Sequence, residues 1–193
     1  MTESQIAELY ASAAATAVPV IDGIPDERLT AATPCPGYDV AGLLDHLYEV
    51  AVEFEKAARG EDMSFAATPP HRVHGEWRTG LNAAVDRLVA AWSAPEAMTF
   101  DRSSMGMPRR VVARMPVLDL VVHGWDLAVA TGQEVRVDDA TVTDLSAVLT
   151  ELAPTGRQMG AFGAEVPVPD SAPAFDRLLG LAGRDPRWRQ SAA

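Results

Sequence analysis

The sequence has little cysteine, no long apolar run and no basic residues near its N-terminus. Cys35 is the single cysteine, which excludes an intrachain disulfide. The most apolar early stretch, residues 10–21, is interrupted by Pro19 and is shorter than the ~20 residues that a membrane-spanning helix needs. The first ten residues contain Glu3 and Glu8 but no Lys or Arg, unlike a secretory signal. We therefore expect a cytoplasmic protein without a membrane partner.

Basic residues are also scarce. The chain has 16 Lys and Arg against 27 Asp and Glu, a formal net charge of −11. A field of this sign repels phosphate backbones, so we expect no nucleic-acid partner. Hydrophobic residues make up 48% and charged residues 22% of the 193 residues, which is typical of one globular domain.

Apolar residues recur at helical spacing in four long stretches. These stretches cover roughly residues 2–21, 39–59, 77–92 and 116–131. Because each apolar stripe can be buried only against the others, the pattern predicts an all-α protein built on a four-helix bundle. We expect the bundle to occupy residues 1–132.

A small extension over residues 133–193 is expected to pack on the bundle. Leu145 and Leu149 belong to the apolar stripe of a fifth helix, and residues 164–169 resemble a short extended strand. Asp170 is a candidate N-cap for a last helix. Before the extension, residues 93–114 lack clear periodicity and predict a long loop, which in a compact domain is often functional.

The stretch 116–131 carries the first chemical signal. Between Val117 and Ala130, the side chains that can ionise are those of Asp119, His123 and Asp126. Their spacing of four and then three residues places them along one face of a helix that is otherwise apolar. A buried carboxylate costs several kcal/mol unless it is paired, protonated or bound to a metal.

A shared cation is one way to stabilise this row. Asp119 and His123 can reach the same ion, and His46 on the stretch 39–59 is turned towards the bundle interior as a third ligand. Three protein ligands with an open position are typical of a catalytic metal site. Two plainer alternatives stay open: His46 as a hydrogen-bonded core histidine, and Asp119 with His123 as a buried ion pair.

Asp126 has three candidate roles. It could be a fourth ligand, a group that hydrogen-bonds a ligand without touching the metal, or a cap for the turn at residues 33–37. We favour the last two.

Other residues near these stretches are weaker candidates. Arg109, Arg110 and Arg114 form a basic cluster that is either solvated or binds an anionic substrate or a thiol. His74 is more often exposed or capping than ligating, although it is a candidate for substrate or thiol binding. Cys35 has no basic neighbour in sequence to lower its pKa, so we do not expect a nucleophile.

Four sequence blocks resemble actinobacterial metal-binding proteins of the DinB superfamily, the group related to the N-terminal domain of mycothiol-dependent maleylpyruvate isomerase. The blocks are TPCPGYDV (33–40), LLDHL (43–47), VHGWDLA (122–128) and LLGLAGRDPRW (178–188). The resemblance runs from about residue 5 to residue 188, and its most specific part is the His-Gly-Trp-Asp block.

This resemblance implies a DinB-like bundle that binds one divalent metal, zinc or nickel, through His46, Asp119 and His123. It also implies mycothiol as a co-substrate and allows a homodimer. Two features differ from the isomerase. The isomerase has Glu where this chain has Asp119, and its C-terminal domain is larger than the part of this chain that follows Gly132.

The residues and the resemblance together predict a metal-dependent thiol transferase or isomerase that acts on a small electrophile. One alternative is a metal-dependent hydrolase, for which His74 is the spare general base. Another is a non-catalytic metal-binding or ligand-binding protein. Thiol-dependent loss of an electrophile, cleavage without thiol, and binding without turnover distinguish the three.

Overall fold

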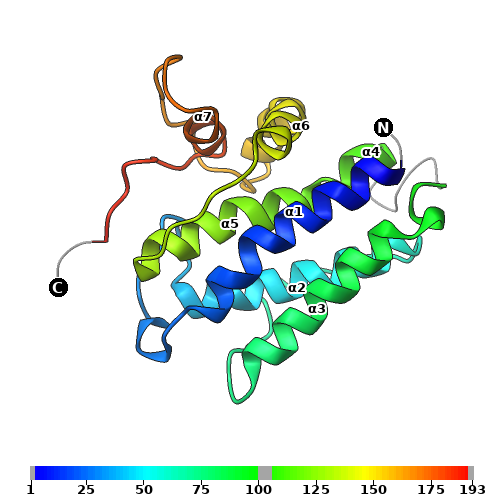
Figure 1. Cartoon of the computed structure of the whole chain (residues 1–193), viewed down its shortest axis with the longest axis horizontal. Coiled ribbons are helices and arrows are strands. Elements are labelled where there is room, and N and C mark those ends of the chain that lie inside the picture. Colours follow the sequence, from blue (N-terminus) through cyan, green and yellow to red (C-terminus); the bar gives the residue numbers. More distant parts are fainter. Residues whose placement is uncertain (1–2, 100–105, 191–193) are drawn as a thin grey trace.

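The computed structural model describes residues 3–99 and 106–190 of the chain. Four long helices pack side by side as a bundle, in which α1 contacts α3 and α5, and α2 contacts the same two helices (Figure 1). These helices are α1 (Glu3–Asp22), α2 (Val40–Ala58), α3 (Trp77–Ser93) and α5 (Met115–Thr131). The predicted four-helix bundle is confirmed.

The ends of α2 and α5 follow local sequence signals. Asp39 is the N-cap of α2, and its Oδ1 accepts the Gly42 N–H at 2.8 Å. Gly132 ends α5 with a left-handed backbone, φ 75°, a conformation that glycine adopts without steric cost.

Helix α5 lies at the centre of the molecule and is buried on nearly all sides. Its apolar side chains are almost fully covered, as the composition of this stretch predicts. Within it, Asp126 is completely buried and His123 is nearly so. His123 and Asp126 are therefore held inside the bundle, on a helix whose other side chains are mostly apolar.

The remaining helices are shorter or lie beside the bundle. Helices α6 and α7 pack on each other, and α6 also contacts α1, on the α1 and α5 side of the molecule (Figure 1). They are α6 (Asp139–Gln158) and α7 (Ala174–Leu181). The division into two units at residue 132 stays a prediction.

Two details of the C-terminal extension differ from expectation. Residues 164–169 form no strand within the described part of the chain, and the Val166 N–H donates to Gly180 O of α7 at 3.0 Å. Pro167 and Pro169 remove the N–H groups that a ladder requires. The last helix is not capped by Asp170, since it begins after Pro173, whose fixed φ suits the start of a helix.

The expected long loop at residues 93–114 contains local helical structure. A 3₁₀-helix covers Pro95–Met98 and the short helix α4 covers Arg109–Val112. Residues 100–105 of this stretch lie outside the described part of the chain. Among the described helices, none is long and apolar enough to cross a membrane.

Candidate metal centre

Helices α2 and α5 bring His46, Asp119 and His123 together. His46 comes from the second turn of α2, and the other two residues lie one turn apart on α5. One ligand atom from each residue lies within 4.8 Å of the others. His123 Nε2 is 3.6 Å from Asp119 Oδ1, and the two imidazole centroids are 5.2 Å apart in an edge-to-face arrangement. The three residues that the sequence singles out thus form one cluster.

The cluster is buried on one side and open on the other. The side chain of His123 is 9% exposed, whereas that of Asp119 is 28% exposed. Burial lowers the pKa of His46, and the nearby Asp119 carboxylate only partly offsets this effect. The site therefore offers a largely uncharged imidazole next to a carboxylate that solvent can reach.

Asp126 orients His123 through the ring nitrogen on the side away from Asp119. Its Oδ2 lies 3.0 Å from His123 Nδ1 in a fully buried position. Because a carboxylate only accepts, Nδ1 carries the hydrogen in this pair, and Nε2 is the ring nitrogen turned towards Asp119. Of the two favoured roles for Asp126, the structure shows hydrogen bonding to the candidate ligand. The turn at residues 33–37 is held instead by Thr33, whose Oγ1 accepts the Cys35 N–H at 3.2 Å.

Arg184 completes this arrangement, and sequence reasoning missed it. Its guanidinium is buried and donates to Asp126 Oδ2 at 3.0 Å and to Ala182 O at 2.9 Å. Burial is the largest single effect and lowers the pKa of Arg184, but Asp126, together with Cys35 and Asp119, holds that pKa above its usual value. The residue lies just after α7 in a block that carries the family resemblance, which was the available signal.

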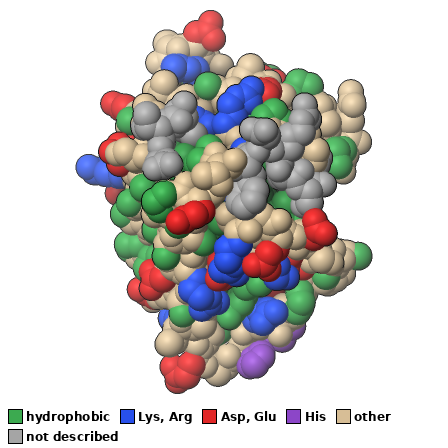
Figure 2. Space-filling view, turned by 90° about the vertical axis from the view of Figure 1, so that its right-hand side faces the viewer, with side chains coloured by type: hydrophobic (Ala, Val, Ile, Leu, Met, Phe, Trp, Pro, Cys, Tyr) green, Lys and Arg blue, Asp and Glu red, His purple; other side chains and the backbone are tan. Residues whose placement is uncertain are grey.

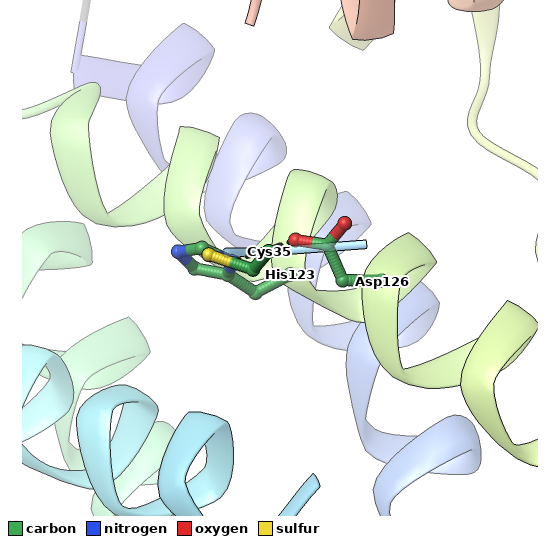
Figure 3. Close-up of side chains that lie close together, drawn as sticks. All are labelled: Cys35, His123 and Asp126. Atoms are coloured by element: carbon green, nitrogen blue, oxygen red, sulfur yellow. Dashed lines mark hydrogen bonds and ion pairs between the residues drawn. The ribbon is translucent and has the colours of Figure 1, made fainter. Parts of the chain in front are cut away.

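Cys35 lies against the same pair of residues. Its Sγ is within 4.8 Å of ligand atoms of His123 and Asp126 (Figure 3). These three residues could also suggest a metal site. However, the positively charged guanidinium of Arg184 is already paired with Asp126 here and balances its charge. Burial raises the pKa of the Cys35 thiol to about 11, so the thiol is protonated at neutral pH.

We expect Cys35 to react slowly with iodoacetamide. At pH 8 a thiol with a raised pKa has little thiolate, and burial limits access further. Alkylation followed by mass spectrometry should be at least ~10-fold slower than for a free thiol under the same conditions. The rate should become normal in guanidinium chloride. Fast alkylation of the native protein would contradict the buried, protonated thiol.

A surface cavity of about 510 Å³ lies along residues 30–39 and the first turn of α2. Cys35 and Tyr38 line it, and the Tyr38 ring also packs on His46 with a centroid distance of 5.6 Å. Both residues therefore belong at once to the cavity wall and to the surroundings of the two imidazoles.

Arg109 has a structural position away from the cluster. Its side chain is buried, with Nε donating to Ala97 O at 2.6 Å and Nη2 to Ala58 O at 2.8 Å. The guanidinium also lies over the Trp92 ring, 4.6 Å from its centroid. These contacts tie the start of α4 to the ends of α2 and α3 and to the 3₁₀-helix at Pro95–Met98.

The other weaker candidates also have partners outside the cluster. Arg114 pairs with Asp144 of α6 at 2.7 Å, and Arg110 contacts Glu151 at 3.4 Å. His74 is exposed and lies beside His71, not among the ligand atoms around His46. A role for the three arginines or for His74 in substrate or thiol binding stays a prediction.

Comparisons with known proteins agree with the fold. Residues 10–128 match the family model described as the mycothiol maleylpyruvate isomerase N-terminal domain. Uncharacterized proteins from two strains of Mycobacterium tuberculosis are each 31% identical over 172 residues, covering 83% of this chain and 87% of the relative.

Two solved structures of the mycothiol-dependent maleylpyruvate isomerase, one of them a mutant, share this fold. Their TM-scores are 0.63 and 0.59 at 14% and 15% identity, and each match covers 86% of this chain and 75% of the other. The family match includes all three cluster residues, but it ends before Arg184. The chain therefore belongs to the family of the mycothiol maleylpyruvate isomerase N-terminal domain.

Proposed function

We propose that this protein binds one divalent cation through His46, Asp119 and His123 and uses it in a thiol-dependent transfer or isomerisation of a small electrophile. The observation that carries the proposal is the convergence of three ligand atoms within 4.8 Å of one another inside an apolar bundle. Family membership supports the reaction class, because the solved isomerase structures are described as mycothiol-dependent.

The three candidate ligand side chains suit a divalent metal ion of intermediate softness. Two imidazoles and one carboxylate are ligands that zinc and nickel accept, and three protein ligands leave positions open for other molecules. A cation also offsets the cost of placing Asp119 beside two imidazoles in a largely buried site. When bound, the cation supplies positive charge that lowers the pKa of a thiol that coordinates it.

The side chains of this protein orient and shield that position. Asp126 holds His123 with its Nε2 turned to Asp119, and Arg184 balances the buried charge of Asp126. Tyr38 covers one side of His46. The remaining access lies on the side of Asp119, so this carboxylate borders the place where a thiol and an electrophile would meet.

The proposal is tested with purified protein loaded with one equivalent of Zn²⁺ or Ni²⁺. Mycothiol is the thiol, maleylpyruvate is the first electrophile, and loss of the electrophile is followed by absorbance. We expect loss that needs both the metal and the thiol, and metal-free protein serves as the control. Ester cleavage without thiol would replace the proposal with a hydrolase, and tight ligand binding without turnover would replace it with a binding protein.

A further inference from the structure

The segment between α2 and α3 carries the two histidines that the proposed centre does not use. Carboxylates spaced one turn apart along α2 fasten the backbone of this segment to the bundle. Asp45 accepts the Arg72 and Val73 N–H groups at 2.7 and 3.0 Å, Glu49 accepts Ala66 N–H at 2.8 Å, and Glu53 accepts Ser64 N–H at 2.7 Å. The backbone around the histidines therefore has a defined position.

His71 is oriented in the same way as His123. Its Nδ1 lies 2.9 Å from Oδ2 of Asp45, whose carboxylate is buried, while the His71 side chain is 68% exposed. Because the carboxylate accepts, Nδ1 carries the hydrogen in this pair, and Nε2 is the ring nitrogen available to a metal ion. A carboxylate behind an imidazole is a recurrent arrangement in metal sites, where it fixes the ring and makes the free nitrogen more basic.

His74 lies next to this oriented ring. The two ring centroids are 6.1 Å apart, and the rings are inclined by 53°. The His74 N–H donates to Arg72 O at 2.9 Å, and Gly75 follows with φ 57°, so the chain turns back at this point. The backbone hydrogen bond and the turn at Gly75 thus hold the two imidazoles side by side in the ligand-free protein.

Both imidazoles are at the surface and are surrounded by charges of both signs. Histidine side chains are visible at one edge of the face in Figure 2, close to basic and acidic side chains. The guanidinium of Arg72 lies over the Tyr48 ring, 4.7 Å from its centroid. Asp45 supplies the adjacent negative charge, and the whole chain carries a net charge of −11, which favours cations over anions.

We propose that His71 and His74 form a second, surface-exposed binding site for a divalent transition-metal ion such as Cu²⁺, Ni²⁺ or Zn²⁺. The two imidazoles supply the protein ligands, and water completes the coordination. The site is weaker than the proposed centre in the bundle, because it has two protein ligands instead of three and lies in solvent. Among these ions, Cu²⁺ binds most tightly.

The test is a calorimetric titration of metal-free protein with Ni²⁺. Wild-type protein should bind one ion tightly and a second ion more weakly. His71→Ala and His74→Ala should each weaken the second class by more than ~10-fold, since removal of a supporting carboxylate alone costs 10–100-fold. Asp45→Asn keeps both ligands and should weaken the second class by ~10-fold. His71 and His74 are exposed, so these variants fold.

Two controls separate this site from the proposed centre and from general charge. His46→Ala should lose the tight class and keep the weaker one. Asp62→Asn removes an exposed carboxylate from the same segment and should leave both classes unchanged. In the His46→Ala protein, Cu²⁺ should broaden the ring NMR signals of His71 and His74 first. Wild-type affinity of the second class in both the His71 and His74 variants, or its absence from wild type, would overturn the proposal.

Discussion

Replacement of His123 with alanine is expected to remove the tightly bound metal while leaving a folded helical protein. His123 is one of three ligands on a rigid scaffold, so its loss should weaken metal binding by more than ~100-fold, beyond the 10–100-fold cost of losing a supporting hydrogen bond. Alanine is the best helix former, so α5 should persist. Elemental analysis after dialysis and far-UV circular dichroism measure the two effects.

His71→Ala is the matched control for this experiment, because it also removes an imidazole from the chain. His71 lies on the segment between α2 and α3 and is paired with Asp45, so the tightly bound ion should stay. Full metal retention by His123→Ala would remove His123 from the ligand set. Loss of the tight ion from His71→Ala would mean that the wrong histidine had been chosen.

The second large effect concerns the buried pair of Asp126 and Arg184. Asp126→Ala is expected to lower the free energy of unfolding of the metal-free protein by about 3–5 kcal/mol, because it leaves a buried guanidinium without its carboxylate. Arg184→Met removes the guanidinium and leaves Asp126 with His123 as its remaining partner. Urea denaturation of each variant, followed by circular dichroism, measures the loss.

The double variant Asp126→Ala/Arg184→Met distinguishes a coupled pair from two separate effects. With no unpaired charge left, its loss of stability should be smaller than the sum of the single losses. Metal affinity should fall more in Asp126→Ala than in Arg184→Met, because Asp126 touches the candidate ligand His123 directly. Additive losses of stability would contradict the coupling of the two residues.

Periodicity was enough to find the central cluster. Asp119, His123 and Asp126 stand out because the rest of their helix is apolar, and a spacing of four and three residues places them on one face. His46 could be added because neighbouring leucine and valine side chains turn it inward. These are local properties of single helices, so the sequence predicts them without knowledge of how the chain continues.

Arg184 could not be found in this way. It reaches Asp126 across 58 positions of sequence and comes from a short connection after α7, where no helical period fixes the direction of a side chain. The same reason applies to the partners of Arg109, whose guanidinium donates to the backbone carbonyls of Ala97 and Ala58. Tertiary contacts of loop residues depend on the packed fold.

Anomalous diffraction from crystals grown with one equivalent of Zn²⁺ locates the ion most directly. Data collected on both sides of the zinc absorption edge should show the strongest peak between α2 and α5. It should lie about 2.0–2.2 Å from a donor atom of each of His46, Asp119 and His123. Stoichiometric zinc whose strongest peak lies elsewhere, with no density between the two imidazoles, would contradict the metal centre and the thiol chemistry that depends on it.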